Sequence, residues 1–210
     1  MSSSSKPTIG LTQFIDFTVK QTMSAKINKV TEIKNQGDYH PAKDHWKQLR
    51  EQIRYCCENG LSFDLLDNLP LSVHERKVNS YKEAIRSFKK FVRNKEISWF
   101  DPPKSHWNYS DQIVVRSTPE LGLIIDGVPH LVKLFFKGNT EKITERNIKP
   151  ILNLMVTSTR EHECPENTVV CVLNIKNSKL HVERNASPAV LKALKYEALT
   201  FRNIWDGESF

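Results

Sequence analysis

The sequence predicts a protein of the α/β or α+β class, in which a helical N-terminal half is followed by a mixed sheet and a C-terminal helix. Three observations lead to this prediction. Apolar residues in the first half recur at helical intervals. From residue 98 onward, short apolar runs alternate with turn-forming residues, as is typical of strands. A helical pattern returns at residue 187, behind a Ser-Pro start that suits the first turn of a helix.

The chain has 210 residues, a length that fits one compact unit. We expect residues 1–8, which include a run of serines, to be a disordered tail. Residues 9–73 are predicted to form a helical extension. Residues 74–210 are predicted to form a mixed α/β core that packs with this extension into one compact unit.

The helical spacing of the first half falls into three segments. Residues 9–36 are predicted to be helical up to Gly37, a common stop residue. Residues 41–59 form a second predicted helix, with its apolar residues on one stripe. We expect residues 61–72 to be a loop, and residues 74–96 give the clearest helix of the chain.

The helix predicted over residues 74–96 carries an apolar stripe and a basic stripe. Its apolar residues recur at i, i+4, i+7 and i+11, which builds one buried face; they are Tyr81, Ile85, Phe88 and Val92. Basic residues repeat this spacing one residue later, about 100° around the cylinder, at Lys82, Arg86, Lys89 and Arg93, and Lys90 adds a cation beside them. This stripe is either a surface that contacts phosphates or a solvated face whose lysine stems cover the edge of the core. We add Arg116 to the candidate phosphate contacts.

A Pro- and Trp-rich segment at residues 98–111 is expected to be a loop. Three strands should follow it, at residues 112–118, 121–126 and 130–136. Pro119 disfavours one uninterrupted ladder through the first two strands, because proline has no N–H to donate. Asp126-Gly127 predicts a hairpin between the last two, because glycine readily takes a positive φ.

The remaining elements complete an order of helix, three strands, helix and strand from residue 74. Residues 137–155 are predicted to be helical, and residues 168–175 form a β-branched run that suits a central buried strand. Residues 177–183 are its expected partner, and residues 187–205 form the last helix. The first three strands can form an antiparallel meander, and the next helix allows a right-handed crossover to a strand parallel to the third. This order predicts a mixed sheet with helices on both faces.

The charge of the chain is uneven. The net charge is +7, and residues 1–97 hold 17 Lys and Arg against 11 Asp and Glu, whereas the remainder is nearly balanced. An excess of cations in one half indicates a polyanionic partner, for which DNA or RNA is the usual case. A mildly basic soluble protein without such a partner is the alternative.

Composition also bears on the cellular location. No apolar run approaches the roughly 20 residues that cross a bilayer, and the N-terminus lacks the pattern of a secretory signal. We therefore expect an intracellular, cytoplasmic protein without a membrane partner. Its four cysteines lack paired zinc-site spacing and are expected to be free thiols. His162 and Cys164 suit two zinc ligands, but no further ligands are evident.

The predicted hairpin contains one acid and two lysines whose geometry follows from strand alternation. A two-residue loop places Glu120 opposite Lys133, and a four-residue loop places it opposite Phe135. Both registers put Glu120, Lys133 and Lys137 on one face of the sheet. A carboxylate can hold Mg²⁺, and a lysine can position or polarise an attacking water. The alternative is a cross-strand ion pair without catalytic meaning.

The element order and the hairpin charges together resemble the core of the PD-(D/E)XK nuclease superfamily, over roughly residues 74–175. The resemblance implies that Glu120 binds Mg²⁺ or Mn²⁺, and that Lys133 or Lys137 acts on the attacking water. Asp126 in the turn, or Glu83 on the basic helix, would then complete the metal site.

The third strand departs from the family pattern. The residues two positions before the lysines are Leu131 and Phe135, where the family has Asp or Glu. We therefore expect a nucleic-acid-binding protein with a nuclease-like core that is either a metal-dependent phosphodiesterase or non-catalytic. The alternative is a non-enzymatic interaction or structural protein that assembles through an apolar surface, for example as a homo-oligomer.

Overall fold

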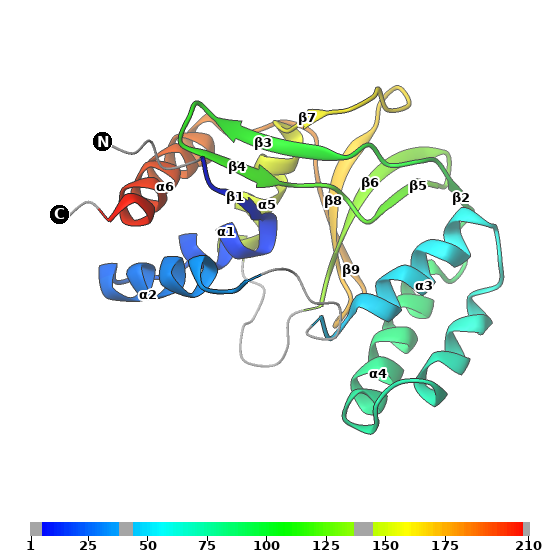
Figure 1. Cartoon of the computed structure of the whole chain (residues 1–210). Helices are drawn as coiled ribbons and strands as arrows, with labels where there is room; N and C mark the ends of the chain where they lie inside the picture. The colour runs from blue at the N-terminus through cyan, green and yellow to red at the C-terminus, as the bar shows by residue number, and fades with distance from the viewer. Residues whose placement is uncertain (1–5, 38–43, 137–144, 208–210) are drawn as a thin grey trace.

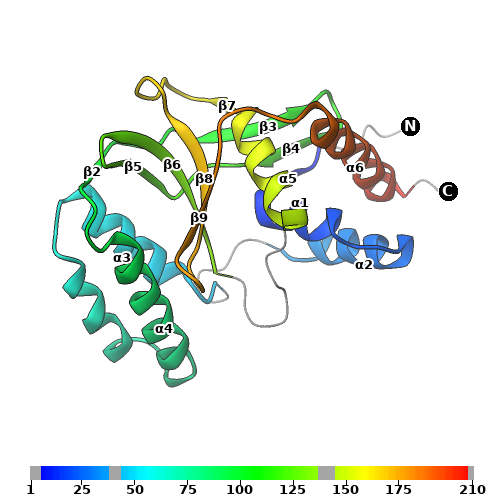
Figure 2. The same cartoon turned by 180° about the vertical axis from the view of Figure 1, so that it is seen from behind.

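The computed structural model describes residues 6–37, 44–136 and 145–207 of the chain. The larger of two β-sheets lies between two groups of helices, and the smaller sheet packs with one of these groups (Figure 1). Helices α1 (Leu11–Thr18), α2 (Met23–Lys34), α5 (Glu145–Val156) and α6 (Pro188–Asp206) are on one side, and α3 (Lys47–Glu58), the 3₁₀-helix η2 (Phe63–Leu71) and α4 (Glu75–Val92) are on the other (Figure 2). The predicted class, a mixture of helices and mixed sheets with a C-terminal helix, is confirmed.

The larger sheet has the order β2 (Ile97–Trp99), β5 (Leu121–Ile125), β6 (Val128–Phe135), β8 (Val169–Asn174) and β9 (Lys179–Glu183). β5 is antiparallel to both β2 and β6, β8 is parallel to β6, and β9 is antiparallel to β8. Because α4 precedes β2 and α5 connects β6 to β8, the predicted order of helix, three strands, helix and strand is present in this sheet.

One strand of that prediction is wrong. Residues 112–118 were expected to be the first strand of the meander, but β4 (Ile113–Arg116) belongs to the smaller sheet, between β1 (Thr8–Gly10) and β3 (Ser105–Tyr109). The expected loop at residues 98–111 instead contains β3 and the end of β2, and the latter takes the place next to β5.

The reason lies in the segment between β4 and β5. Ser117 still donates its N–H to Ser105 of the smaller sheet, whereas Glu120 donates its N–H to Val132 of the larger one. Pro119 stands between them and has no N–H to pair. The chain therefore changes sheets at the proline. The small sheet is completed by β7 (Thr159–Arg160), which pairs with β3.

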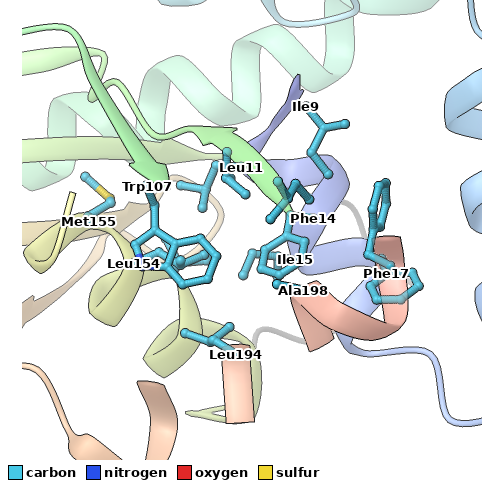
Figure 3. Packing of buried hydrophobic residues seen from close by; sticks show 14 of the residues in the cluster. Ile9, Leu11, Phe14, Ile15, Phe17, Trp107, Leu154, Met155, Leu194 and Ala198 are labelled. Carbon is cyan, nitrogen blue, oxygen red and sulfur yellow. The ribbon is translucent and has the colours of Figure 1, made fainter. Parts of the chain in front are cut away.

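β8 divides the interior into two apolar cores. Its six residues are all buried, which confirms the predicted central strand. Val170 and Val172 point into a first core with α1, α2, α5, α6 and the smaller sheet, part of which Figure 3 shows. Cys171 and Leu173 point into a second core with α3, η2, α4 and the hairpin of β5 and β6. This alternation follows from the two-residue period of a strand.

The N-terminal half contributes to both cores. The helix predicted over residues 9–36 is in fact two helices, because the chain leaves the helix after α1 and Thr22 caps α2 by accepting the N–H of Ala25 at 3.2 Å. The expected loop at residues 61–72 is largely the 3₁₀-helix η2. Thr8 is paired with Val114, so the expected tail ends in an ordered strand.

The C-terminal helix begins where the sequence predicts, after Ser187 with Pro188 in its first turn. The Ser187 side chain makes no capping hydrogen bond. Its backbone N–H instead donates to the side-chain oxygen of Asn153 on α5 at 2.6 Å, which ties the start of α6 to α5. Among the helices of the described segments, none has the length and apolar character that a bilayer crossing demands.

Gly122 on β5 is required by a close approach of two backbone segments. Phe100 donates its N–H to the Gly122 carbonyl at 3.0 Å, and a Cβ on Gly122 would lie 2.3 Å from the Phe100 carbonyl oxygen. A side chain at this position must therefore push β5 away from the segment that follows β2.

We predict that Gly122→Ala lowers the free energy of unfolding by about 2–4 kcal/mol, measured by urea denaturation. Gly10→Ala is the control, because its Cβ would meet only the flexible Gln13 side chain at 3.3 Å. The control should cost at most about 1 kcal/mol. Equal losses in the two variants would contradict the proposed steric cause.

Candidate functional site

The hairpin of β5 and β6 has the two-residue turn, which is one of the two loop lengths that the sequence allows. Ile125 is paired with Val128, and Leu121 with Val132, so Glu120 and Lys133 face each other. Asp126 and Gly127 have φ angles of 49° and 82°, both positive. Two positive φ values suit the tight turn that matches the twist of a hairpin, and Asp-Gly favours them. The turn chemistry therefore sets the register that brings the acid and the lysine together.

Glu120 and Lys133 form a close, half-buried ion pair. The distance from Glu120 Oε1 to Lys133 Nζ is 2.6 Å, and the two side chains are 19% and 17% exposed. Glu120 Oε2 accepts the backbone N–H of Leu134 at 2.8 Å. Lys133 Nζ also donates to the carbonyl oxygen of Thr118 at 3.2 Å. Both carboxylate oxygens of Glu120 are thus occupied by donors.

The pair lines an open cleft of about 710 Å³. A second ion pair lies in the same cleft, where the Arg50 guanidinium donates to both carboxylate oxygens of Asp44, at 3.2 and 2.5 Å. Arg116 on β4 also lines the cleft; it is exposed and makes no ion pair with a described residue. Among the described residues that line it, the cleft therefore contains two paired carboxylates and one additional cation.

The described residues of this cleft do not offer a divalent metal a set of free ligands. Mg²⁺ requires oxygen ligands in near-octahedral geometry at about 2.0–2.1 Å. Each oxygen of the Glu120 carboxylate accepts a hydrogen bond, from Lys133 or from Leu134, and the carboxylate of Asp44 is paired with Arg50. Within the described residues, no three His, Cys, Asp or Glu side chains converge into a metal-binding group. The residues present place an ammonium, rather than a metal ligand, beside Glu120.

The other predicted metal and catalytic residues lie elsewhere. Asp126 is at the opposite end of β5, six residues or roughly 20 Å from Glu120, and its Oδ1 accepts the Glu96 N–H at 2.9 Å. Glu83 is exposed on α4 and does not line the cleft. Lys137 lies outside the described residues. The structure thus brings together Glu120 and Lys133 and separates Asp126 from them.

The predicted basic stripe lies on the outer side of α4. Four of its cations are exposed and make no ion pair within the part of the chain that the structure describes; they are Lys82, Arg86, Lys90 and Arg93. Lys89 is different, since its Nζ donates to Asp64 at 2.6 Å and to Asp67 at 2.8 Å on η2. These hydrogen bonds raise the pKa of Lys89 and lower that of Asp64.

A shallow groove of about 400 Å³ runs between α4 and η2, lined by four of the stripe residues together with Asp67 and Pro70. No described residue lines both this groove and the cleft around Glu120. The groove is therefore a second, separate surface.

The acid–lysine pair in the cleft and the basic groove along α4 lie on opposite faces of the larger sheet. Lys133 is in register with Val172, and paired residues point to the same side of a sheet. Val172 belongs to the first core, whereas the apolar face of α4 belongs to the second core together with Val132 and Leu134. α4 therefore covers the face opposite to the one on which Lys133 lies.

Sequence reasoning did not find Asp44, His45 and Arg50. The only local signal is Asp44 before a predicted helix, where its Oδ1 accepts the Trp46 N–H at 3.2 Å. His45 reaches the cleft because its Nε2 lies 2.9 Å from Ser80 Oγ and its carbonyl accepts the Tyr81 hydroxyl. Burial lowers the pKa of His45. These contacts join segments that only the tertiary fold brings together.

The suggested zinc ligands do not form a complete site in the described segments. His162 and Cys164 line one shallow hollow, but they belong to no group of three potential ligands among the described residues. All four cysteines are free thiols in the structure, and burial raises the pKa of Cys57 to about 12.

No known protein family has a sequence model that matches this chain, and no curated protein matches it. The function must therefore be argued from the two surfaces themselves.

We predict that Glu120 and Lys133 are energetically coupled. In a double-mutant cycle with Glu120→Gln and Lys133→Met, the coupling free energy should be about 1–2 kcal/mol, because the pair is largely desolvated and held by two further hydrogen bonds. The same cycle on the exposed pair Lys47 and Glu51 is the control and should give about 0.3–0.5 kcal/mol. Urea denaturation measures both, and a Glu120–Lys133 coupling no larger than the control would contradict a fixed pair.

Proposed function

We propose that this protein binds DNA or RNA through the basic face of α4, on a nuclease-like core that does not use a divalent metal for cleavage. The observation that carries the proposal is the row of exposed, unneutralised cations along one helix. Lys82, Arg86 and Arg93 line a groove that is open to solvent. Such a row is the electrostatic footprint of a phosphate-contacting surface.

The spacing of these cations suits a nucleic-acid backbone. From Lys82 to Arg93 the helix rises about 17 Å, since each residue adds about 1.5 Å. Lys82, Arg86, Lys90 and Arg93 are three or four residues apart, so cations recur about every 4.5–6 Å along this stretch of the chain. Duplex DNA presents one negative charge about every 1.7 Å of its axis, so a strand along the groove brings several phosphates within reach.

Asp64 and Asp67 limit the number of useful cations. They neutralise Lys89 in the middle of the row, so its ammonium adds little to the positive field. The binding is therefore assigned mainly to Lys82, Arg86, Lys90 and Arg93. Arg116, which lies in the cleft on another element, contributes to a different surface.

The proposal includes no metal-dependent cleavage because the Glu120 and Asp44 carboxylates of the cleft are each paired with a cation. The larger sheet supports a nuclease-like core, because α4, β2, β5, β6, α5 and β8 follow the order of helix, three strands, helix and strand on which the resemblance to the PD-(D/E)XK superfamily rests, although β2 replaces the strand expected at residues 112–118. Glu120 is the only acid of the expected motif in the cleft, and it is paired with Lys133. Assembly through the apolar hairpin has less support, because Leu121, Leu123 and Leu134 are buried within the chain.

We predict binding of short DNA or RNA that weakens steeply with salt. With three to four phosphate contacts, the slope of log K against log salt concentration should be about −3. Arg86→Gln should weaken binding and reduce the slope by about one unit. Fluorescence anisotropy measures both quantities.

The matched control is Lys192→Gln, which removes one exposed cation from α6 on the other side of the molecule. It should leave the slope unchanged. Failure to bind any nucleic acid at low salt, or equal effects of Arg86→Gln and Lys192→Gln, would rule out the α4 surface.

We also predict that neither Mg²⁺ nor Mn²⁺ induces cleavage of the bound DNA or RNA, because the only motif acid in the cleft is already neutralised. Gel analysis of the nucleic acid after incubation with each metal tests this. Cleavage that disappears in Glu120→Ala, with binding retained, would overturn the metal-free part of the proposal and leave the α4 surface intact.

A further inference from the structure

We infer that the groove between α4 and η2 takes a single strand of DNA or RNA, with its phosphates on α4 and its bases on η2, and that Asp67 accepts a hydrogen bond from an amino group of a base. This inference rests on the proposed function, because it names the form of nucleic acid that the same groove binds. Three features of the groove carry it: a cationic wall, an acidic wall, and an exposed apolar side chain at its end.

The two walls of the groove carry opposite charges. On α4, three cations are exposed and make no ion pair with a described residue; they are Lys82, Arg86 and Arg93. On η2, the side chains of Asp64 and Asp67 are 80% and 58% exposed, and Asp67 lines the groove. Because the first wall attracts phosphate and the second repels it, a bound strand turns its backbone to α4 and its bases to η2.

A duplex does not match this pattern of charge. The major groove of DNA is about 12 Å wide, and one helix of about 10–12 Å diameter fills it. η2 packs directly beside α4, where Asp64 and Asp67 both bond Lys89, so η2 would lie over a row of phosphates at the rim of the major groove. A single strand has one backbone, which it can place on α4 alone, and it avoids this repulsion.

An exposed apolar side chain at the end of η2 also favours unpaired bases. Leu71 is 85% exposed, and it follows Pro70, which lines the groove. Unpaired bases pack their faces on aromatic or apolar side chains, whereas the base faces of a duplex are covered by its own stacking. Leu71 is therefore covered by the bases of a single strand and gains no such contact from a duplex.

Asp67 has a carboxylate oxygen that a base can reach. Its Oδ2 accepts the Lys89 ammonium at 2.8 Å, and no described residue donates to its Oδ1. Asp64 differs, because its Oδ1 accepts from Lys89 and its Oδ2 accepts from the Ser62 hydroxyl at 3.1 Å. A carboxylate oxygen suits the exocyclic amino group of cytosine, which thymine and uracil lack. Asp67 therefore favours cytosine over thymine or uracil.

The test is fluorescence anisotropy at low salt with three labelled oligonucleotides of equal phosphate number, each prepared as DNA and as RNA. They are oligo(C), oligo(T) or oligo(U), and a hairpin duplex. Oligo(C) should bind at least about tenfold more tightly than the hairpin. It should bind about two- to tenfold more tightly than oligo(T) or oligo(U), which is the worth of one hydrogen bond.

Asp67→Ala should change both preferences. The preference for oligo(C) over oligo(T) or oligo(U) should fall to about one, because the accepting oxygen is lost. The hairpin should gain more affinity than oligo(C), because part of the repulsion of the second backbone is removed. Preferences that stay as they are in the unsubstituted protein would overturn the role of Asp67.

Glu32→Ala is the matched control. Glu32 on α2 is a 60% exposed carboxylate that bonds Lys29 Nζ at 2.9 Å, so this variant also removes an acid that pairs with a lysine, on the other side of the molecule. It should leave both preferences unchanged. Equal changes in Glu32→Ala and Asp67→Ala would show that net charge alone sets the preferences, and would overturn the inference.

Leu71→Ser tests the position of the bases separately. It should weaken the binding of oligo(C) at least about twofold and leave the binding of the hairpin unchanged, because only unpaired bases cover Leu71. Equal effects on the two, or no effect on oligo(C), would contradict bases on η2.

The outcomes separate this inference from the proposed function. Failure of all the oligonucleotides to bind would refute the proposed function, and this inference with it. Binding of the hairpin as tight as that of oligo(C) would refute the single-strand inference alone and leave α4 as a phosphate-contacting surface.

Discussion

The burial of β8 on both of its faces is the constraint on which the rest of the structure depends. Since Val170 and Val172 need one apolar core, and Cys171 and Leu173 need another, helices must cover both sides of the larger sheet. α4 turns its apolar stripe to the second core, and this leaves its basic stripe on the outside, against η2. Lys133 lies on the other face of the sheet because its neighbour in register is Val172. The strand alternation of β6 and β8 thus keeps the basic groove and the acid–lysine pair apart.

The same alternation accounts for the residues that stand where the predicted motif would have its acids. Leu131, two residues before Lys133, is on the same face and is 2% exposed. An acid at this position would place a charge in an apolar environment, at a cost that a distant metal cannot offset. Glu120 has a different role from a free metal ligand. It lies just before the start of β5, and both its backbone and its side chain form hydrogen bonds with β6. Lys133 neutralises it. The residues of the motif therefore serve packing and pairing within this sheet.

Some of this could be predicted from the sequence. Asp126-Gly127 predicted the hairpin, and strand alternation placed Glu120 and Lys133 on one face in both of the registers that the sequence left open; the structure adopts the two-residue turn, with Glu120 opposite Lys133. The β-branched run of β8 indicated a strand buried on both faces. The partner of β5 was not predictable, because residues 97–99 and 113–116 both have strand propensity and only the change of sheet at Pro119 decides between them. The pair of Asp44 and Arg50 was not predictable either. Its position in the cleft with Glu120 depends on how α3 packs against the sheet.

The separation of the two surfaces has an energetic consequence. Residues that share no partner and lie on different elements contribute nearly additively to free energies, so changes on α4 and changes in the cleft should be independent. In a metal-dependent nuclease the cations that hold the phosphate and the carboxylate that holds the metal must act on one phosphodiester, which couples them strongly. Here the sheet stands between the basic stripe and Lys133, and the carboxylate already has an internal cation. A phosphate bound along α4 therefore gains nothing from Glu120, and this independence is the physical basis for assigning binding to one surface and a structural role to the other.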